Sequence, residues 1–184
     1  MSNGPLQADG TVQQLNSGAN GMTVEQFDRI YGQAKPYFEY WFGQAVQKTM
    51  PTWIHSMLQK IIMRFLDDAG YESGAEVKLK ISGDFQPLPD VCAVRPGEVE
   101  LPYPTRPVEV VVEILSPDDQ FSQIATKCQF YGELGINHIY VVDPDTRELW
   151  RWNRDRPLTL VDSLVSIPAS AIWLELDRRI KQNR

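Results

Sequence analysis

The sequence predicts an α/β fold in which helices flank a central, twisted, mixed β-sheet. Residues 108–115 and 139–142 are aliphatic runs rich in β-branched side chains, which is typical of buried strands. Residues 52–68 repeat apolar side chains at the i, i+3, i+4 and i+7 positions of an amphipathic helix. Strands that alternate with helices along a chain favour a sheet covered by helices.

The chain is organised around the aliphatic run over residues 108–115. Side chains alternate across a strand, so this run has one purely apolar face and one face with two carboxylates. The apolar face holds Val108, Val110, Val112 and Ile114, and the other holds Glu109, Val111, Glu113 and Leu115. A buried carboxylate such as Glu113 is tolerated only when another group compensates its charge. The strand therefore leads to a candidate site.

A helix is predicted directly after this strand, over residues 117–134. Ser116 is expected to be its N-cap and Pro117 its first residue, and Gly135 is expected to end it. Lys127 lies on the flank of the apolar stripe of this helix, and its ammonium should reach over the edge of the sheet without entering the core. Replacing Lys127 should then leave the fold nearly intact. The sheet-facing residues are expected to be Phe121, Ile124, Ala125, Cys128 and Tyr131.

Earlier in the chain, residues 37–42 and 45–48 form a predicted pair of strands with a turn at Gly43. Glu39 lies alone among aromatic rings in the first strand, where it is either a structural carboxylate or part of a site. The helix over 52–68 starts at Thr52 or Pro51, and His55 falls off its apolar stripe. His55 lacks a second histidine at helical spacing, which favours a structural or substrate-proximal role over metal ligation.

Two more strands are predicted, over residues 75–81 and 85–94, followed by a proline-rich surface loop over 95–107. Alternation places Glu76 outward in the first of them, as a solvated or paired residue. Prolines interrupt the second before Asp90, so Asp90 should lie where regular pairing resumes. A strand start of this kind is a natural position for a ligand-bearing carboxylate.

The remaining segments complete a single predicted domain over residues 22–176. Residues 1–21 are polar and without periodicity, so we expect a flexible arm, followed by a short helix over 24–34 that Thr23 caps. Near the other end, residues 148–165 should form an added β-hairpin, residues 167–176 are either a strand or a short helix, and residues 177–184 are expected to be a frayed basic tail.

Composition narrows the class of protein. The chain has 184 residues and a formal net charge of −6, a globular composition whose acidity opposes nucleic-acid binding. The charge is uneven, because Arg147, Arg151, Arg154 and Arg156 cluster in the hairpin region, either as a phosphate-facing patch or as a solvated surface. Cys92 and Cys128 show no metal-binding spacing, and we expect reduced core thiols in a cytoplasmic protein. No apolar run is long enough to span a membrane.

Several motifs together resemble a known family. In order along the chain they are Glu39 with Gly43, His55 near the start of a helix, Glu76, Pro89-Asp90, Glu113-Ile-Leu-Ser-Pro117, Lys127 with Tyr131 and Gly135, and Val142-Asp143-Pro144. This order resembles the Uma family (Uma-two) of small bacterial endonucleases, within the restriction-endonuclease-like PD-(D/E)XK superfamily. The resemblance covers roughly residues 22–150. It implies a restriction-endonuclease-like fold.

The resemblance also implies chemistry for these residues. It assigns catalytic roles to Asp90, Glu113, Lys127 and Glu39, and Mg²⁺ or Mn²⁺ binding to Asp90, Glu113 and the backbone carbonyl of Ile114. A divalent ion supplies both a nucleophile and charge stabilisation for phosphodiester hydrolysis. His55, Glu76 and Tyr131 are candidates for substrate-proximal positions. The superfamily lysine usually lies two residues after the glutamate, where this chain has Leu115, so Lys127 must supply the cation from the helix, as it does in the Uma family.

The expected activity is therefore divalent-metal-dependent hydrolysis of nucleic acid, with DNA as the expected substrate. The expected assembly is a homodimer, because a two-fold pair can close a cleft around a duplex and because Trp150, Trp152 and Trp173 are expected to be exposed. The main alternative is a non-cleaving binding or regulatory protein on the same fold. An unrelated hydrolase or structural module, in which Asp90 and Glu113 are only structural carboxylates, is a further alternative.

Overall fold

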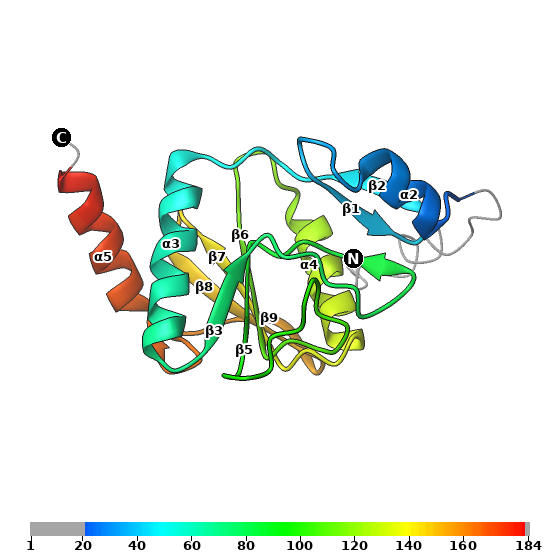
Figure 1. The fold of residues 1–184 in the computed structure, drawn as a ribbon. Helices are drawn as coiled ribbons and strands as arrows, with labels where there is room; N and C mark the ends of the chain where they lie inside the picture. Colours follow the sequence, from blue (N-terminus) through cyan, green and yellow to red (C-terminus); the bar gives the residue numbers. More distant parts are fainter. Residues whose placement is uncertain (1–20, 183–184) are drawn as a thin grey trace, which may run out of the picture.

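A computed structural model describes residues 21–182. Its centre is a six-stranded sheet with the strand order β3-β5-β6-β7-β8-β9 (Figure 1). The strands of this sheet are β3 (Glu72–Ala75), β5 (Val91–Val94), β6 (Val110–Ile114), β7 (His138–Asp143), β8 (Glu148–Asn153) and β9 (Arg156–Leu160). The central pair β6–β7 is parallel and the other pairs are antiparallel. The predicted mixed sheet flanked by helices is confirmed.

Helices cover both faces of the large sheet. Helix α3 (Trp53–Asp68) and helix α5 (Ala169–Gln182) pack on one face, and helix α4 (Phe121–Glu133) lies on the other (Figure 1). The alternation along β6 follows from this arrangement. Val110, Val112 and Ile114 join the core beneath α3 and α5, whereas Val111 joins the core beneath α4. Glu113 is on the α4 side, as the alternation predicts.

A second, three-stranded sheet stands beside α4. It has the order β2-β1-β4 and consists of β1 (Phe38–Trp41), β2 (Gln44–Gln47) and β4 (Phe85–Gln86). The predicted turn at Gly43 is present, and its φ of +86° is one that glycine adopts without strain. Helix α2 (Val24–Tyr31) precedes this sheet and begins with a capping box between Thr23 and Gln26. Of the predicted arm over residues 1–21, residues 1–20 lie outside the described part of the chain.

The prediction of a strand over residues 75–81 is wrong. The strand that pairs with β5 is β3, and it ends at Ala75, where Glu76 adopts a φ of +53°. The lysines that follow turn toward α2, since Lys80 donates to Asp28 at 2.9 Å and the buried Lys78 lies 3.4 Å from the same carboxylate. The single strand predicted over 85–94 is two strands in different sheets, because Pro87 and Pro89 lack the amide hydrogens that a continuous ladder needs.

Helix α4 begins four residues later than predicted, at Phe121, and Ser116 is not its N-cap. Ser116 and Asp119 instead close a turn, in which the Ser116 amide donates to Asp119 Oδ2 and the Asp119 amide donates to the Ser116 carbonyl. Asp119 therefore belongs to this turn and not to α4. Phe121, expected to face the sheet, is 49% exposed.

The C-terminal part holds the predicted hairpin, with β8 and β9 as its strands. Beyond it, β10 (Ser163–Leu164) and β11 (Ile167–Pro168) form a small pair, and α5 resolves the ambiguous segment as a helix that continues through Gln182. The expected frayed tail is therefore helical over most of its length. Arg178 and Arg179 both donate to Glu175 in this helix. Cys92 and Cys128 are free and buried, as expected, and within residues 21–182 no helix is long and apolar enough to cross a membrane.

The contact between α4 and β8 provides a test of the packing. Gly132 of α4 lies against the Trp152 ring so closely that an added Cβ would overlap the indole. We expect Gly132→Ala to lower the free energy of unfolding by about 1–3 kcal/mol through overpacking, even though alanine is the better helix former. Gly83→Ala is the control, because no atom lies within 4 Å of its Cβ position. Denaturant titration of both variants measures the effect, and equal stabilities would contradict the packing described.

Candidate active site

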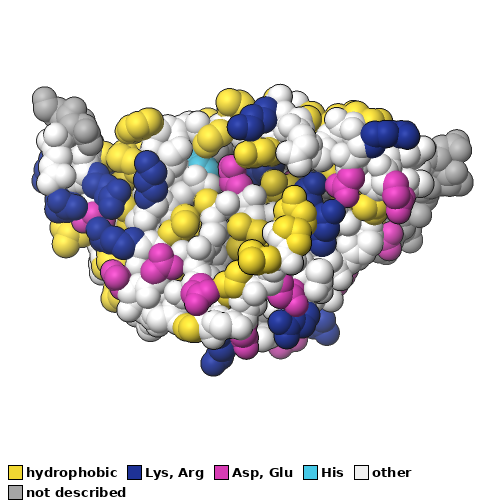
Figure 2. Space-filling model, viewed as in Figure 1, with side chains coloured by type: hydrophobic (Ala, Val, Ile, Leu, Met, Phe, Trp, Pro, Cys, Tyr) yellow, Lys and Arg dark blue, Asp and Glu magenta, His cyan; other side chains and the backbone are white. Residues whose placement is uncertain are grey.

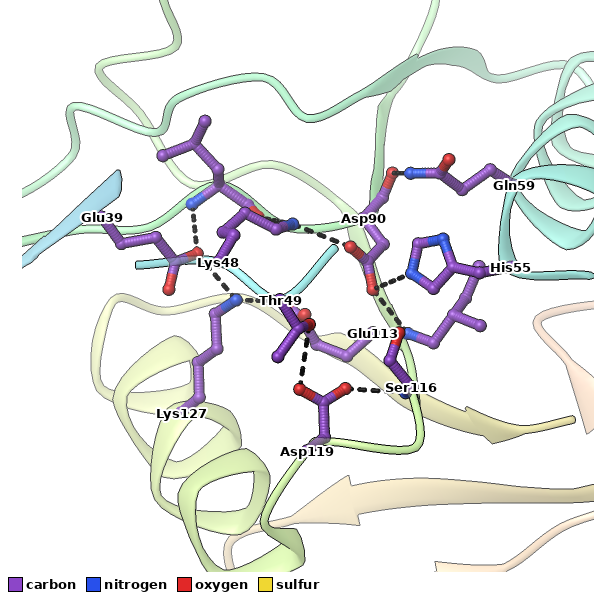
Figure 3. A network of polar contacts seen from close by, with 12 residues as sticks. Glu39, Lys48, Thr49, His55, Gln59, Asp90, Glu113, Ser116, Asp119 and Lys127 are labelled. Carbon is purple, nitrogen blue, oxygen red and sulfur yellow. Dashed lines mark hydrogen bonds and ion pairs between the residues drawn. The ribbon is translucent and has the colours of Figure 1, made fainter. Parts of the chain in front are cut away.

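Three carboxylates and two lysines meet in a small pocket between the two sheets and α4 (Figure 3). Glu39 comes from β1, Asp90 from the residue before β5, Glu113 from β6 and Lys127 from α4. Because the antiparallel register pairs Val91 with Val112, Asp90 falls beside Glu113. The pocket has a volume of about 70 Å³. The fold thus brings together the four residues to which the sequence analysis assigned catalytic roles.

Asp90 is buried and held from several sides. Its Oδ2 accepts from the Ile114 amide at 2.7 Å and lies 3.1 Å from His55 Nε2, and its Oδ1 accepts from Lys48 Nζ at 2.7 Å. The carbonyl of Asp90 accepts from Gln59 of α3 at 3.1 Å. Burial by itself would raise the pKa of this carboxyl, but Lys48 and His55 outweigh burial and hold the pKa of Asp90 well below its usual range. Asp90 is therefore ionised at neutral pH.

Glu113 has a different electrostatic environment. Its Oε1 accepts from the Tyr131 hydroxyl at 2.6 Å and from Lys127 Nζ at 2.9 Å. Burial is the largest influence and outweighs the favourable Lys127 charge, so the pKa of Glu113 is raised to about 7. The neighbouring Asp90 charge acts in the same direction as burial. Two adjacent carboxyl groups with pKa values displaced in opposite directions are typical of functional sites.

Lys127 is buried, with 4% of its surface exposed, so its predicted position on the flank of the helix is wrong. Its Nζ lies 2.7 Å from Glu39 Oε1 and 2.9 Å from Glu113 Oε1. Helix α4 shares a core cluster with residues of the small sheet, and Glu39 of β1 contacts Lys127 from that side. Burial disfavours the charged ammonium, but Glu113 and Glu39 outweigh it and raise the pKa of Lys127 far above its usual range.

Glu39 is bound to several donors in the pocket. Its Oε1 accepts from the Leu88 amide at 2.7 Å as well as from Lys127, and its Oε2 accepts from the Trp41 indole at 3.0 Å. These contacts use the carboxylate to hold Lys127 and the chain just before Asp90. Glu39 is thus both structural and part of the site, two roles that the sequence analysis treated as alternatives.

Of the three residues predicted to lie near the substrate, two lie in the site and one does not. Tyr131 lies in the site because it donates to Glu113. The sequence analysis placed His55 off the apolar stripe of α3. In the structure His55 is buried against Asp90, because the N-terminal turn of α3 faces the site. Glu76 is half-buried and is not among the residues that line the pocket. Ile114 contributes its amide to Asp90.

The sequence analysis missed Lys48, Thr49 and Asp119. Lys48 follows β2 directly, and its ammonium binds Asp90 and the Leu88 carbonyl, each at 2.7 Å. The Thr49 hydroxyl donates to Asp119 at 3.1 Å and joins this segment to the turn before α4. One signal in the sequence indicates such a residue: three buried carboxylates need more than the single cation of Lys127. The sequence does not show which lysine supplies the second charge.

The donor set fits a hard divalent cation, for which oxygen ligands are usual. Asp90 Oδ2 already has two partners, which leaves Oδ1 as the oxygen of Asp90 with a lone-pair direction to spare. On Glu113, Oε1 has two partners, and no hydrogen bond within residues 21–182 engages Oε2. A cluster of three or more His, Cys, Asp or Glu side chains suited to hold an ion is not found in that part of the chain. An ion would therefore rest on two carboxylates.

The fold and the site define a restriction-endonuclease-like α/β protein. The sequence pattern of the Uma2 family, described as "Putative restriction endonuclease", matches residues 24–177, and the chain belongs to this family. It is also similar in structure to a "putative nuclease belonging to DUF820" from Anabaena variabilis ATCC 29413. That similarity has a TM-score of 0.69 at 18% identity and covers 84% of this chain and 99% of the other. No curated protein matches the chain. The family assignment supports a nuclease function.

The raised pKa of Glu113 predicts a pH-dependent stability. The pKa of Glu113 is about 7 in the folded state and 4.5 in the unfolded state. The folded protein therefore loses stability as pH rises between these values, because the unfolded chain releases its proton first. In EDTA, Glu113→Gln should match wild type near pH 5 and should be more stable at pH 8, by up to about 3 kcal/mol. Melting temperatures across this range measure the difference. A variant that is less stable at every pH would show that Glu113 is held by a structural partner.

The burial of Lys127 replaces the expectation that its removal leaves the fold nearly intact. Lys127→Met should lower the free energy of unfolding by about 3–5 kcal/mol, because Glu39 and Glu113 lose their shared cation in a buried pocket. The loss should be larger at pH 8 than at pH 5, where Glu113 is protonated. Lys60→Met, on the exposed face of α3, is the matched control. Denaturant titration at the two pH values tests this, and equal stability of the two variants would contradict the ion-pair geometry.

Proposed function

We propose that the protein is a divalent-metal-dependent nuclease that hydrolyses phosphodiester bonds, with DNA as its substrate. The observation that carries the proposal is the pair of carboxylates, Asp90 and Glu113, beside the buried ammonium of Lys127 in one pocket. Family membership supports nuclease activity. Metal dependence rests on the chemistry of the donor set.

Mg²⁺ or Mn²⁺ would be held by Asp90 and Glu113, with the Ile114 carbonyl as the further ligand that the family resemblance implies. When bound, such an ion supplies a nucleophile at neutral pH and neutralises charge on the phosphate. The chain's own groups prepare the site for this. His55 and the Ile114 amide fix the orientation of Asp90, and Tyr131 fixes that of Glu113.

Lys127 is the group that stabilises developing negative charge. Glu39 holds its ammonium beside Glu113, and a cation fixed in a water-poor pocket needs no reorganisation when charge develops on the substrate. Glu113 and Glu39 raise the pKa of Lys127 far above its usual range, so its ammonium supplies a positive charge to the site.

A second candidate function is a non-cleaving binding or regulatory protein on the same fold. The observation that favours it is the pairing of each carboxylate with a lysine, since Lys48 binds Asp90 while Lys127 binds Glu39 and Glu113. Each of the three carboxylates thus has a cationic partner that belongs to the protein itself. Measured affinity for Mn²⁺ separates the two candidates.

DNA as the substrate and the homodimer remain predictions. On the face drawn in Figure 2, Lys and Arg side chains are interspersed with Asp and Glu. Two of the basic residues near the C-terminus are neutralised, because Arg147 binds Asp177 and Arg178 binds Glu175. The tryptophans that motivated the dimer are half-buried, since Trp150 and Trp152 pack on the α4-side core and Trp173 packs on the α3-side core. Trp53, two residues before His55, is 75% exposed.

The proposal is tested by cleavage of plasmid DNA and of a single-stranded RNA in Mg²⁺ or Mn²⁺. Wild type should cleave DNA only when a divalent ion is present, and Glu113→Gln should lose about 10²-fold or more in rate because it removes a charge needed at the reacting centre. Glu109→Gln is the control, because Glu109 directly precedes β6 and pairs with Arg95 outside the pocket. This variant should cleave DNA as wild type does. Calorimetry with Mn²⁺ provides a readout independent of turnover. Wild type without Mn²⁺ affinity and without cleavage would favour the binding-protein alternative.

A further inference from the structure

Lys48 occupies the oxygen that an incoming ion needs. Its Nζ lies 2.7 Å from Asp90 Oδ1 and donates to the Leu88 carbonyl at 2.7 Å (Figure 3). Asp90 Oδ2 is already used by the Ile114 amide and His55. A divalent ion that binds Asp90 must therefore approach Oδ1, where it would meet the ammonium.

The two lysines of the pocket are held differently. Lys127 bridges two carboxylates, Glu39 and Glu113. Lys48 binds one carboxylate, and its second partner is the uncharged Leu88 carbonyl. The Lys48 side chain is also the more exposed of the two, at 11% against 5%. Lys48 is thus the cation that is easier to displace.

The backbone of Lys48 is fixed, and its side chain lines the pocket of about 70 Å³. The Lys48 amide donates to the Tyr37 carbonyl at 2.9 Å, which anchors the residue at the end of β2. The side chain lines the pocket together with Thr49, Asp119 and Gln123. Lysine has a flexible four-carbon stem, so its ammonium can change partners while the backbone stays in place.

Resting on the proposed function, we propose that Lys48 is an exchangeable cation of the active site. In the ion-free protein it neutralises Asp90. When a divalent ion takes Oδ1, the ammonium leaves this oxygen and binds a phosphate oxygen of the substrate in the same pocket. Lys48 thereby competes with the ion and assists the substrate, so its removal has opposite effects on ion affinity and on cleavage.

Lys48→Met is the variant that tests the exchange, because methionine keeps most of the side-chain length and removes the charge. Its matched control is Lys60→Met, which makes the same change at an exposed position of α3. Calorimetry with Mn²⁺ alone should show about tenfold tighter binding by Lys48→Met than by wild type, since a close like charge is removed. Lys60→Met should bind Mn²⁺ as wild type does. At saturating Mn²⁺, Lys48→Met should cleave DNA more slowly despite its tighter ion binding.

Each outcome decides the question. Equal or weaker Mn²⁺ binding by Lys48→Met overturns the exchange and leaves the metal-dependent nuclease intact. Tighter binding with undiminished cleavage overturns the phosphate contact. The absence of Mn²⁺ binding in both proteins overturns the exchange together with the proposed function, whereas binding by Lys48→Met alone supports the exchange.

A measurement on wild type keeps the test valid if Lys48→Met does not fold. Crystals grown in EDTA and then soaked in Mn²⁺ should show an anomalous peak in the pocket that Asp90 and Glu113 line. Lys48 Nζ should then lie beyond hydrogen-bonding distance of Asp90 Oδ1. A bound ion with Lys48 still on that oxygen overturns the exchange.

Discussion

Charge compensation inside one pocket is the constraint on which the rest of this structure depends. Glu39, Asp90 and Glu113 are all buried, and burying an unpaired carboxylate costs more than a folded domain can sustain. Lys127 and Lys48 make this burial possible by pairing with them at 2.7–2.9 Å. The network still carries more negative than positive side chains, and burial together with the neighbouring Asp90 charge raises the pKa of Glu113. A pocket with spare negative charge and hard oxygen donors is suited to a divalent cation.

The architecture serves this pocket by bringing short segments from distant parts of the chain to one place. The parallel pair β6–β7 is buried on both faces, which holds Glu113 rigidly, and the register with β5 sets Asp90 beside it. The small sheet carries Glu39 and leads directly to Lys48, while α4 carries Lys127 and Tyr131. The turn at Ser116–Asp119 delays the start of α4, and the Thr49–Asp119 hydrogen bond joins the two sides of the pocket. The site is thus shared between both sheets and cannot form from either one alone.

The contacts around each oxygen connect this geometry to function. Glu39 is fully engaged in positioning Lys127 and the Leu88 amide, which makes it a support of the site more than a ligand. Asp90 and Glu113 each keep one oxygen with a lone-pair direction to spare. These two oxygens explain why the same network is compatible both with an ion-dependent nuclease and with a stable ion-free protein.

The sequence by itself determined the fold class and the central strand with its alternating faces, and its resemblance to the Uma family indicated the set of Asp90, Glu113, Lys127 and Glu39. The fold class and the strand rest on local patterns, because β-branched runs and helical periodicity are properties of neighbouring residues. Only the tertiary structure decided that Lys127 is buried, that His55 faces Asp90 and that Lys48 supplies the second cation. Local patterns also failed at residues 75–81 and at Ser116, where Asp28 and Asp119 offered partners that outweighed strand and helix propensity. Which cation compensates a buried carboxylate depends on which segments meet in space, and helical or strand spacing carries no information about that.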